Sequence, residues 1–270
     1  MIHIKDLNFA YRRQPSLFND LSLHLESGSI TGLLGKNGSG KTSLLKLITG
    51  LSHPKSGVIS VLDHNPYKRE VSVLSNVYLV PEEFSVPAIS IKNYLKAYSP
   101  FYPQFDHGLF DRIIREFDLI PETYLQRFSF GQKKKFLIAF ALATRCRLLI
   151  LDEPTNGLDI PSKSLFRKIL AGSLNENQLV IISTHQVKDV ENLIDKIMIL
   201  EYGKVIFHRT IQEISQKVCF ISGTSDAVEG AIYSESVLGG YRLILPNSNA
   251  ETEVDIELLF NAIINGKKIE

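Results

Sequence analysis

The stretch GKNGSGKT at positions 35–42 constrains the fold more than any other part of the sequence. It follows an apolar segment typical of a buried strand, and it opens a helical pattern at 42–49. Glycines let backbone N–H groups wrap around phosphate oxygens, Lys41 can reach the outer phosphates, and the Thr42 hydroxyl can bind Mg²⁺. The helix dipole adds to this anion site. The sequence therefore predicts a phosphate-binding loop between a strand and a helix. A glycine-rich turn that only caps the helix is the alternative.

The segment RLLILDEP at 147–154 supplies groups that a phosphate loop lacks. An apolar strand that ends at Asp152 would place a carboxylate beside Thr42, where it could hold Mg²⁺ directly or through water. Glu153 comes next and could orient and deprotonate an attacking water. Two acids at a strand end are common by themselves, so their functional interpretation depends on the phosphate loop.

The segment ISTHQ places His185 just past another buried strand. A histidine at such a position is usually a surface or hydrogen-bonding residue. Here it ends a third strand of the same predicted sheet, and sheets of this kind gather their ligands at the carboxyl ends of the strands. We therefore favour a contact between His185 and a terminal phosphate.

Strand patterns alternate with helical patterns along most of the chain. Residues 2–11 are expected to form an edge strand, residues 83–143 a helical region, residues 187–193 a helix, and the segment around Gly203 a hairpin. The alternation predicts an α/β fold with a mainly parallel sheet covered on both faces. Beyond about residue 215 the pattern weakens, and we expect a strand at 241–246 and a helix at 255–266.

Composition excludes several classes of protein. The formal net charge of +1 gives no overall attraction to nucleic acid or to an anionic membrane. The longest apolar run, at 136–151, is interrupted by Arg145 and Arg147 and is too short to span a membrane. Neither a span nor a signal peptide is expected, so any membrane contact would be made through a partner. The 2 cysteines, Cys146 and Cys219, are expected to be buried free thiols in a reducing compartment.

The ordered motifs resemble the nucleotide-binding domain of ATP-binding cassette (ABC) transporters over about residues 1–214. Positions 35–42 match Walker A, 148–153 match Walker B and the catalytic Glu, NGLD at 156–159 matches the D-loop, and STH matches the switch motif. FSFGQ, at 128–132, lies where the family signature belongs. The resemblance implies a P-loop NTPase (RecA-like) core with an antiparallel β subdomain and a helical subdomain at about 83–143. A small C-terminal α+β extension, 215–270, would follow this domain.

The resemblance also implies ATP and Mg²⁺ as bound groups. It assigns catalytic roles to Glu153, His185 and Lys41. It assigns the metal to Thr42, Asp152 and Glu82. The residues that it implies in nucleotide contacts are Tyr11, Gly35, Lys36, Asn37, Gly38, Ser39, Gly40, Lys41, Thr42, Ser43, Ser129, Gly131, Gln132 and Asp159.

Two of these contacts have a specific chemistry. Tyr11 would stack on the adenine, a contact worth about 1–3 kcal/mol, unless it is only a surface tyrosine at a strand end. Ser43 would lie near the α-phosphate.

In this family two domains enclose two ATP molecules head to tail, and the signature of one domain completes the site of the other. Ser129 and Gln132 predict a capping box that starts an amphipathic helix. The resemblance adds that Ser129 and the N–H groups near Gly131 face the γ-phosphate held by another chain. The three lysines at 133–135 are expected to form a solvated face; raising the potential near a partner's ATP is the alternative.

Two positions depart from the family pattern. Glu82 stands where the family has the Gln of the Q-loop, which adds negative charge near the triphosphate. Phe130 stands where the signature has its first Gly. Both departures resemble the ABC-2 branch, which includes exporters, and we therefore favour export over import.

The resemblance implies an ATP-hydrolysing subunit that powers export through ATP-driven dimerisation, as a homodimer or with a paralogous cassette. A separate membrane permease would dock around residues 82–102, and the chain would lie in the cytoplasm, on the inner face of the membrane. The alternatives are an importer subunit, a soluble ABC protein of translation or repair, and a nucleotide sensor that does not hydrolyse ATP. The extension is expected to be regulatory or to stabilise the dimer.

Overall fold

A 6-stranded sheet lies at the centre of the molecule, in the strand order β5-β6-β7-β3-β8-β9. The computed structural model describes residues 1–224, 228–247, 250 and 252–269. Strands β5, β6, β7, β3 and β8 are parallel, and β9 pairs antiparallel with β8. The strands span Ser29–Leu34 (β3), Val77–Val80 (β5), Leu148–Asp152 (β6), Leu179–Thr184 (β7), Lys196–Glu201 (β8) and Lys204–Thr210 (β9). The predicted α/β fold with a mainly parallel sheet is confirmed.

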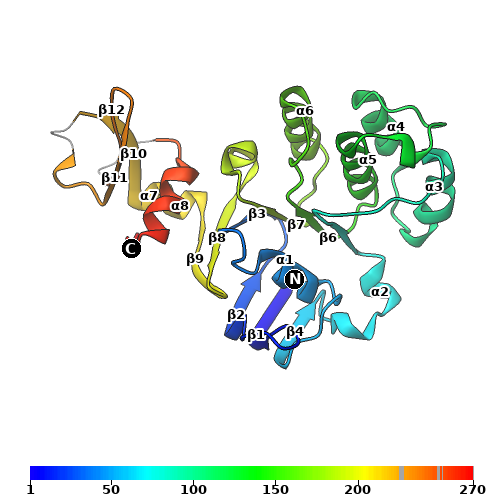
Figure 1. The fold of residues 1–270 in the computed structure, drawn as a ribbon, viewed down its shortest axis with the longest axis horizontal. Helices are drawn as coiled ribbons and strands as arrows, with labels where there is room; N and C mark the ends of the chain where they lie inside the picture. The colour runs from blue at the N-terminus through cyan, green and yellow to red at the C-terminus, as the bar shows by residue number, and fades with distance from the viewer. Residues whose placement is uncertain (225–227, 248–249, 251, 270) are drawn as a thin grey trace.

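Both faces of this sheet are buried, because successive side chains of each strand enter different cores. On β6, Leu149 and Leu151 pack into the core that contains the large helices, whereas Leu148 and Ile150 pack into the core that contains α1. Figure 1 shows α5 and α6 on one side of the sheet and α1 on the other. These helices span Lys41–Ile48 (α1), Phe130–Ala143 (α5) and Ile160–Ala171 (α6).

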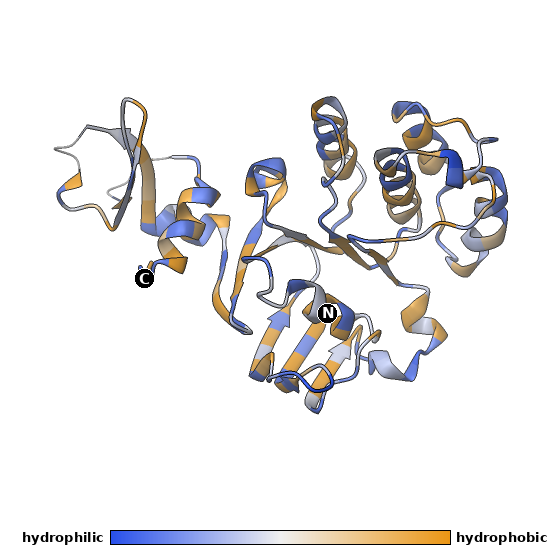
Figure 2. Ribbon diagram, in the orientation of Figure 1, coloured by the Kyte–Doolittle hydropathy of each residue, from blue (hydrophilic) through white to orange (hydrophobic). Residues whose placement is uncertain are grey.

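A 3-stranded antiparallel sheet, in the order β2-β1-β4, shares the second core with α1. Its strands are Ile2–Phe9 (β1), Phe18–Leu25 (β2) and Ser56–Val61 (β4). β1 is the middle strand, so the edge position expected for residues 2–11 is wrong. The alternating pattern, seen as blue and orange bands in Figure 2, reports one buried face but not how many strands pair with it. The second partner, β4, comes from far along the chain and places Val61 opposite Ile2.

The predicted helical region contains α3 (Ile91–Tyr98), α4 (His107–Glu116) and α5. A short helix, α2 (Val71–Leu74), precedes it. Aromatic side chains fill the space between α4 and α5: Phe110, Phe136 and Phe140 are all buried, and their rings meet edge to face or at a tilt. This aromatic core holds the start of α5 in a fixed place beside the central sheet.

The helix expected at 187–193 is not formed. The segment instead makes two short 3₁₀ turns, η4 (Val187–Asp189) and η5 (Glu191–Leu193). Its buried residues are Val187, Val190 and Leu193, spaced three apart. That spacing matches the three residues per turn of a 3₁₀ helix better than the 3.6 of an α-helix. The apolar spacing therefore explains why this expectation is wrong.

The C-terminal part begins with α7 (Ile211–Lys217), so the boundary predicted at 214/215 falls inside a helix. A 3-stranded sheet follows in the order β10-β12-β11, with β10 at Val218–Gly223, β11 at Tyr233–Val237 and β12 at Gly240–Pro246. Helix α8 (Ile256–Ile264) packs back against η4. The strand and helix expected here are present, and β10 and β11 were not expected. Residues 225–227, 248–249, 251 and 270 of the predicted extension lie outside the described residues.

Both cysteines are free and buried, as predicted. Cys146 follows α5, and its Sγ lies 3.6 Å from the carbonyl oxygen of Ser75. Burial raises the pKa of the Cys146 thiol to about 12. Cys219 lies on β10, in the C-terminal part.

Candidate nucleotide site

The predicted phosphate loop connects the end of β3 to the start of α1. Gly38 and Gly40 have φ angles of 80° and 108°, in the left-handed region that favours glycine. A Cβ on Gly35 would come within 2.5 Å of the Leu200 carbonyl oxygen. The hydroxyl of Ser39 is buried and has no hydrogen-bond partner. Tight backbone geometry and an unpaired donor are what a loop that wraps phosphate oxygens requires.

Helix α1 begins without a side-chain cap: its N-cap is Gly40, and no side chain accepts a hydrogen bond from its first turn. The first N–H groups of a helix have no partner within the helix, and here the backbone leaves them available to an anion. Lys41, at the first position, turns back over the loop, and its Nζ donates to the carbonyl oxygen of Gly35 at 2.7 Å. Burial lowers the pKa of Lys41, while the carboxylates of Glu153 and Asp152 act to raise it.

Thr42 and Asp152 meet as predicted, although 110 positions separate them in the sequence. The Thr42 hydroxyl donates to Asp152 Oδ2 at 2.9 Å. The other carboxylate oxygen of Asp152 accepts from the Ser183 hydroxyl, at the end of the neighbouring strand β7. Hydroxyl and carboxylate oxygens are the donors that Mg²⁺ prefers, so these two residues fit a magnesium ion that takes its other ligands from phosphate and water.

Glu82 lies on the same side of the cavity, just after β5, and its Oε1 accepts from Asn156 Nδ2 at 3.1 Å. Within the described ranges, His, Cys, Asp and Glu side chains form no group of three or more that could hold a metal. The predicted metal role of Glu82 stays a prediction, and the structure shows that Glu82 lines the same cavity as Thr42 and Asp152.

Glu153 is nearly fully buried, and residues at the end of β7 orient it. Its Oε1 accepts from the backbone N–H of His185 at 3.0 Å and lies 2.7 Å from His185 Nδ1. Its Oε2 accepts from the Thr184 hydroxyl at 3.2 Å. The backbone φ of Glu153 is 45°, which is rare for a residue with a side chain and marks a strained position at the end of β6. These contacts fix the direction of a carboxylate that could accept a proton from water.

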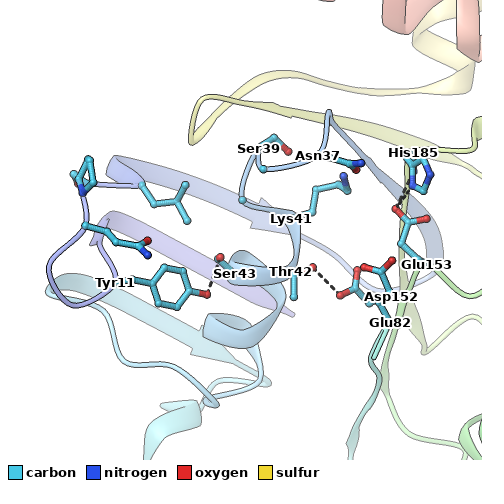
Figure 3. Close-up of a pocket in the computed structure, with 16 residues that line it drawn as sticks. Tyr11, Asn37, Ser39, Lys41, Thr42, Ser43, Glu82, Asp152, Glu153 and His185 are labelled. Carbon is cyan, nitrogen blue, oxygen red and sulfur yellow. Dashed lines mark hydrogen bonds and ion pairs between the residues drawn. The ribbon is translucent and has the colours of Figure 1, made fainter. Parts of the chain in front are cut away.

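These groups line one cavity of about 640 Å³. Figure 3 shows Tyr11 and Ser43 at one end of it, and Glu153 and His185 at the other. The Tyr11 hydroxyl and Ser43 Oγ are 2.9 Å apart. An aromatic ring at one end and acids at the other, with the phosphate loop between them, match the parts of a nucleoside triphosphate. Sequence reasoning missed four lining residues, which follow Tyr11 in the turn before β2: Gln14, Pro15, Ser16 and Leu17.

The predicted signature residues lie at the start of α5, and they do not line this cavity. The capping box is confirmed: Ser129 Oγ accepts from the Gln132 N–H at 3.2 Å, and Gln132 Oε1 accepts from the Ser129 N–H at 2.9 Å. Asp159 serves as the N-cap of α6, where it accepts from the Ser162 N–H at 2.9 Å. A cavity completed by another chain is what the resemblance implies for these residues, and that role stays a prediction.

Phe130, the departure in the signature, packs one part of its ring against its own chain and is 49% exposed. Its ring stacks on Phe84 with ring centroids 5.1 Å apart and an interplanar angle of 21°. The Cδ1–Cε1 edge of the ring lies against Gly157, where an added Cβ would come within 2.5 Å of it. The neighbouring Gly131 is equally constrained, because a Cβ there would lie 2.7 Å from the Gly157 carbonyl oxygen. Phe130 therefore joins the signature, the segment after β5 and the predicted D-loop.

The expectation that the lysines at 133–135 form a solvated face is wrong for Lys134, because this residue is 0% exposed. Lys134 Nζ donates to the carbonyl oxygens of Pro81 at 3.2 Å and Asp152 at 3.4 Å. Lys133 and Lys135 are half-buried. Partners that are distant in sequence satisfy the ammonium group, and the helical pattern alone could not reveal them.

Comparisons with known proteins agree with this geometry. A family model described as "ABC transporter" matches residues 18–156. The chain is 30% identical to the ABC transporter ATP-binding protein NatA of Bacillus subtilis, over 72% of this chain and 82% of that protein. It is 30% identical to the Nod factor export ATP-binding protein I of Burkholderia lata (70% and 64% covered), and 28% identical to the molybdate import ATP-binding protein MolC of Haemophilus influenzae (77% and 82%). A solved ATP-binding subunit of an ABC transporter superposes with a TM-score of 0.71 at 25% identity, over 79% of this chain and 91% of the other.

Proposed function

The chain belongs to the ABC transporter family, and from that premise we propose that it hydrolyses ATP to drive export through separate membrane subunits. One observation carries this proposal: the phosphate loop, Asp152, Glu153 and His185 converge on one cavity. Family membership supports an ATPase subunit of a transporter. The cavity supports the hydrolytic step, because it holds a nucleotide-binding end and a catalytic end together.

The chemistry follows from the positions of the side chains. The loop N–H groups and Lys41 bind the β- and γ-phosphates, while Tyr11 stacks on the base. Water attacks the γ-phosphorus, the bond to the ADP oxygen breaks, and Glu153 accepts the proton of the water. His185 holds the Glu153 carboxylate in place, and its ring also faces the cavity. Magnesium, held by Thr42 and Asp152 with Glu82 nearby, would neutralise phosphate charge when bound.

We place a second copy, or a paralogous cassette, across the cavity. The start of α5 supports this arrangement, because Ser129 and Gln132 are exposed at the surface while their capping box fixes their geometry. Phe130 is 49% exposed beside them, which leaves a large apolar ring available to a partner. ATP held by one chain and touched by the signature of the other would close the dimer, and hydrolysis would reopen it.

An apolar groove supports docking of a permease subunit. The groove has a volume of about 550 Å³ and lies between the α2 region and the end of α3. Its lining includes large apolar side chains that solvent reaches: Val71 is 79% exposed and Phe101 is 65% exposed. The region expected for docking, 82–102, overlaps this lining at Tyr98, Phe101 and Tyr102.

No helix in the described part of the chain is long and apolar enough to cross a membrane. We propose that the chain sits on the cytoplasmic face through this contact.

The direction of transport is proposed from the two departures, Glu82 and Phe130, which resemble the ABC-2 exporter branch. Relatives named for export and for import are both similar to this chain, so import is the second candidate. Reconstitution with its permease, in vesicles with ATP outside, distinguishes the two: export moves substrate into such inverted vesicles, and import does not.

Glu153→Gln tests the hydrolytic assignment. We expect phosphate release to fall about 100-fold or more, because the proton acceptor is lost, while ATP still binds and drives formation of a stable dimer in size-exclusion chromatography. Glu122→Gln, at an exposed glutamate outside the cavity, is the matched control and should be normal. Normal turnover by Glu153→Gln would remove Glu153 from the mechanism.

A wild-type chain that binds ATP but never hydrolyses it, even with its permease, would favour the alternative of a nucleotide sensor. Co-sedimentation with ribosomes, without a membrane partner, would favour the soluble alternative.

A further inference from the structure

Lys134 is a fully buried ammonium group that the mechanism above does not use. It lies in the second turn of α5, and its Nζ reaches the backbone of Asp152, a residue that lines the nucleotide cavity. Its Nζ donates to the carbonyl oxygens of Pro81 and Asp152, and the carbonyl oxygen of Glu82 lies at 3.5 Å. The ring of Phe84 covers it at 5.3 Å. A lysine is almost never fully buried unless it is paired, so this position needs an explanation.

The three carbonyl groups mark the point where two strands separate. Strands β5 and β6 pair in parallel, and their last paired residues are Val80 and Leu151. Immediately beyond this pair come Pro81, which has no N–H, and Asp152. The Lys134 ammonium bridges their carbonyl oxygens, so it joins the two chain segments where the strand ladder stops. It therefore holds the Glu82 segment against the end of β6.

The charges around Lys134 also connect it to the Glu82 segment and to the end of β6. The carboxylates of Glu82, Asp152 and Glu153 all lie near enough to raise its pKa, although burial has the larger effect and lowers the pKa to about 8. Lys41 responds to the same three carboxylates from the loop. Lys41 and Lys134 thus interact electrostatically with the same three carboxylates. Glu82 is the acid that departs from the family pattern, and Lys134 touches its backbone.

We propose that Lys134 is a positioning residue that fixes the Glu82 segment beside the phosphate site and offsets the negative charge of Glu82. The inference rests on the proposed function, because it concerns how the same cavity tolerates three carboxylates next to ATP. A lysine with a purely structural role would donate hydrogen bonds to the carbonyl groups, but its effect on ATP binding would not depend on the charge of Glu82. The quantity to measure is therefore the coupling between positions 134 and 82 in the free energy of nucleotide binding.

A double-mutant cycle at positions 134 and 82 measures it. The readout is the dissociation constant of a fluorescent ATP analogue in EDTA, so that neither magnesium nor turnover contributes. Lys134→Gln retains hydrogen-bond donors and removes the charge, and we expect about tenfold weaker binding because repulsion from Glu82 is no longer offset. Glu82→Gln is measured alone, which completes the cycle, and in the Lys134→Gln background it should restore the affinity to within about twofold of wild type.

Lys135→Gln is the matched control. Lys135 follows Lys134 on the same helix, but its Nζ lies over the ring of Phe117 at 5.9 Å and contacts none of the three acids. This variant should bind the analogue like wild type. A loss in Lys134→Gln that Glu82→Gln does not relieve would overturn the proposal and leave Lys134 as a packing residue. Equal losses in Lys134→Gln and Lys135→Gln would also overturn it.

Folding and the proposed function are checked separately. Thermal unfolding is measured for every variant; if Lys134→Gln alone does not fold, the double variant must fold and bind, and its failure overturns the proposal. If wild type binds the analogue but hydrolyses no ATP, the hydrolysis proposal fails while the binding cycle still decides the role of Lys134. If wild type binds no nucleotide, both proposals fail together.

Discussion

Helices α1 and α5 both begin at sites predicted to meet phosphate, but they begin in opposite ways. The N-cap of α1 is Gly40, with φ of 108° and no side-chain cap. The N-cap of α5 is Ser129, with extended backbone and a complete capping box formed with Gln132. The first helix leaves its N–H groups to a ligand, and the second satisfies its own.

This difference indicates how each helix can contact a phosphate. At α1 the free backbone N–H groups would contact the phosphate, and Gly38 and Gly40 allow the loop the positive φ angles that this requires. At α5 the Ser129 hydroxyl oxygen accepts from a backbone N–H, which leaves its own proton to donate, and Gln132 keeps its NH₂ group. The α1 site suits a ligand that one chain can bind by itself. The α5 start suits a contact that forms when another chain arrives and breaks when it leaves.

The largest effect is expected from Lys41→Met. Loss of the charge on the loop should reduce ATP turnover about 100-fold to 1,000-fold, because an electrostatic contact to the transferred phosphate is removed. Phosphate release measures it, with Lys46→Met, on the same helix, as the control. A much smaller change is expected for Lys46→Met, because Lys46 is exposed in the last turn of α1 and does not line the cavity. Equal losses in both variants would contradict a special role for Lys41.

A smaller effect is expected from Ser129→Ala. Removal of the cap should cost about 1 kcal/mol of unfolding free energy, as measured by chemical denaturation. Ser90→Ala is the matched control, because Ser90 caps α3 by accepting from the Asn93 N–H at 3.3 Å and lies outside the nucleotide cavity. Both variants should be destabilised, and only Ser129→Ala should lose ATP-dependent dimerisation. If the two variants dimerise equally well, the Ser129 hydroxyl is a cap and nothing more.

An effect similar in size to that of Ser129→Ala is expected from Phe130→Gly. Loss of the stacked ring pair should cost about 0.5–1.5 kcal/mol of stability beyond the loss of buried area. Phe84→Leu removes the same stack and leaves the signature side chain in place. We expect weaker ATP-dependent dimerisation in Phe130→Gly than in Phe84→Leu, since only the first removes a ring that a partner could touch. Identical behaviour would mean that Phe130 serves only the packing of its own chain.

The sequence predicted the α1 site better than the surroundings of α5 for a physical reason. The conformation of the phosphate loop is local: Gly38 and Gly40 specify the backbone, and Lys41 and Thr42 follow at fixed positions. The capping box of α5 is also local and was predicted. The burial of Lys134 was not, because its carbonyl partners lie 53 and 18 positions away in the sequence. A lysine is expected to be exposed unless the folded chain supplies polar partners for its ammonium group.

Strand pairing shows the same limit. The pattern of β1 correctly predicted a strand with one buried face, but its pairing with β4 depends on residues 48 to 59 positions later. In the C-terminal part, β12 has a continuous apolar run and was expected, whereas β11 reads Tyr-Ser-Glu-Ser-Val, with partly buried and exposed residues only. Such a strand is defined by its neighbour β12 rather than by its own hydrophobicity.

The burial of both cysteines makes the protein convenient for spectroscopy. A thiol with a pKa near 12 has almost no thiolate at neutral pH, so Cys146 should react very slowly with maleimide or methanethiosulfonate reagents. Leu238, between β11 and β12, is fully exposed, and Val58 on β4 is 64% exposed. Leu238→Cys and Val58→Cys would therefore accept spin labels in the otherwise natural sequence. The distance between the two labels would report whether the C-terminal sheet moves relative to the β1 layer when ATP is added.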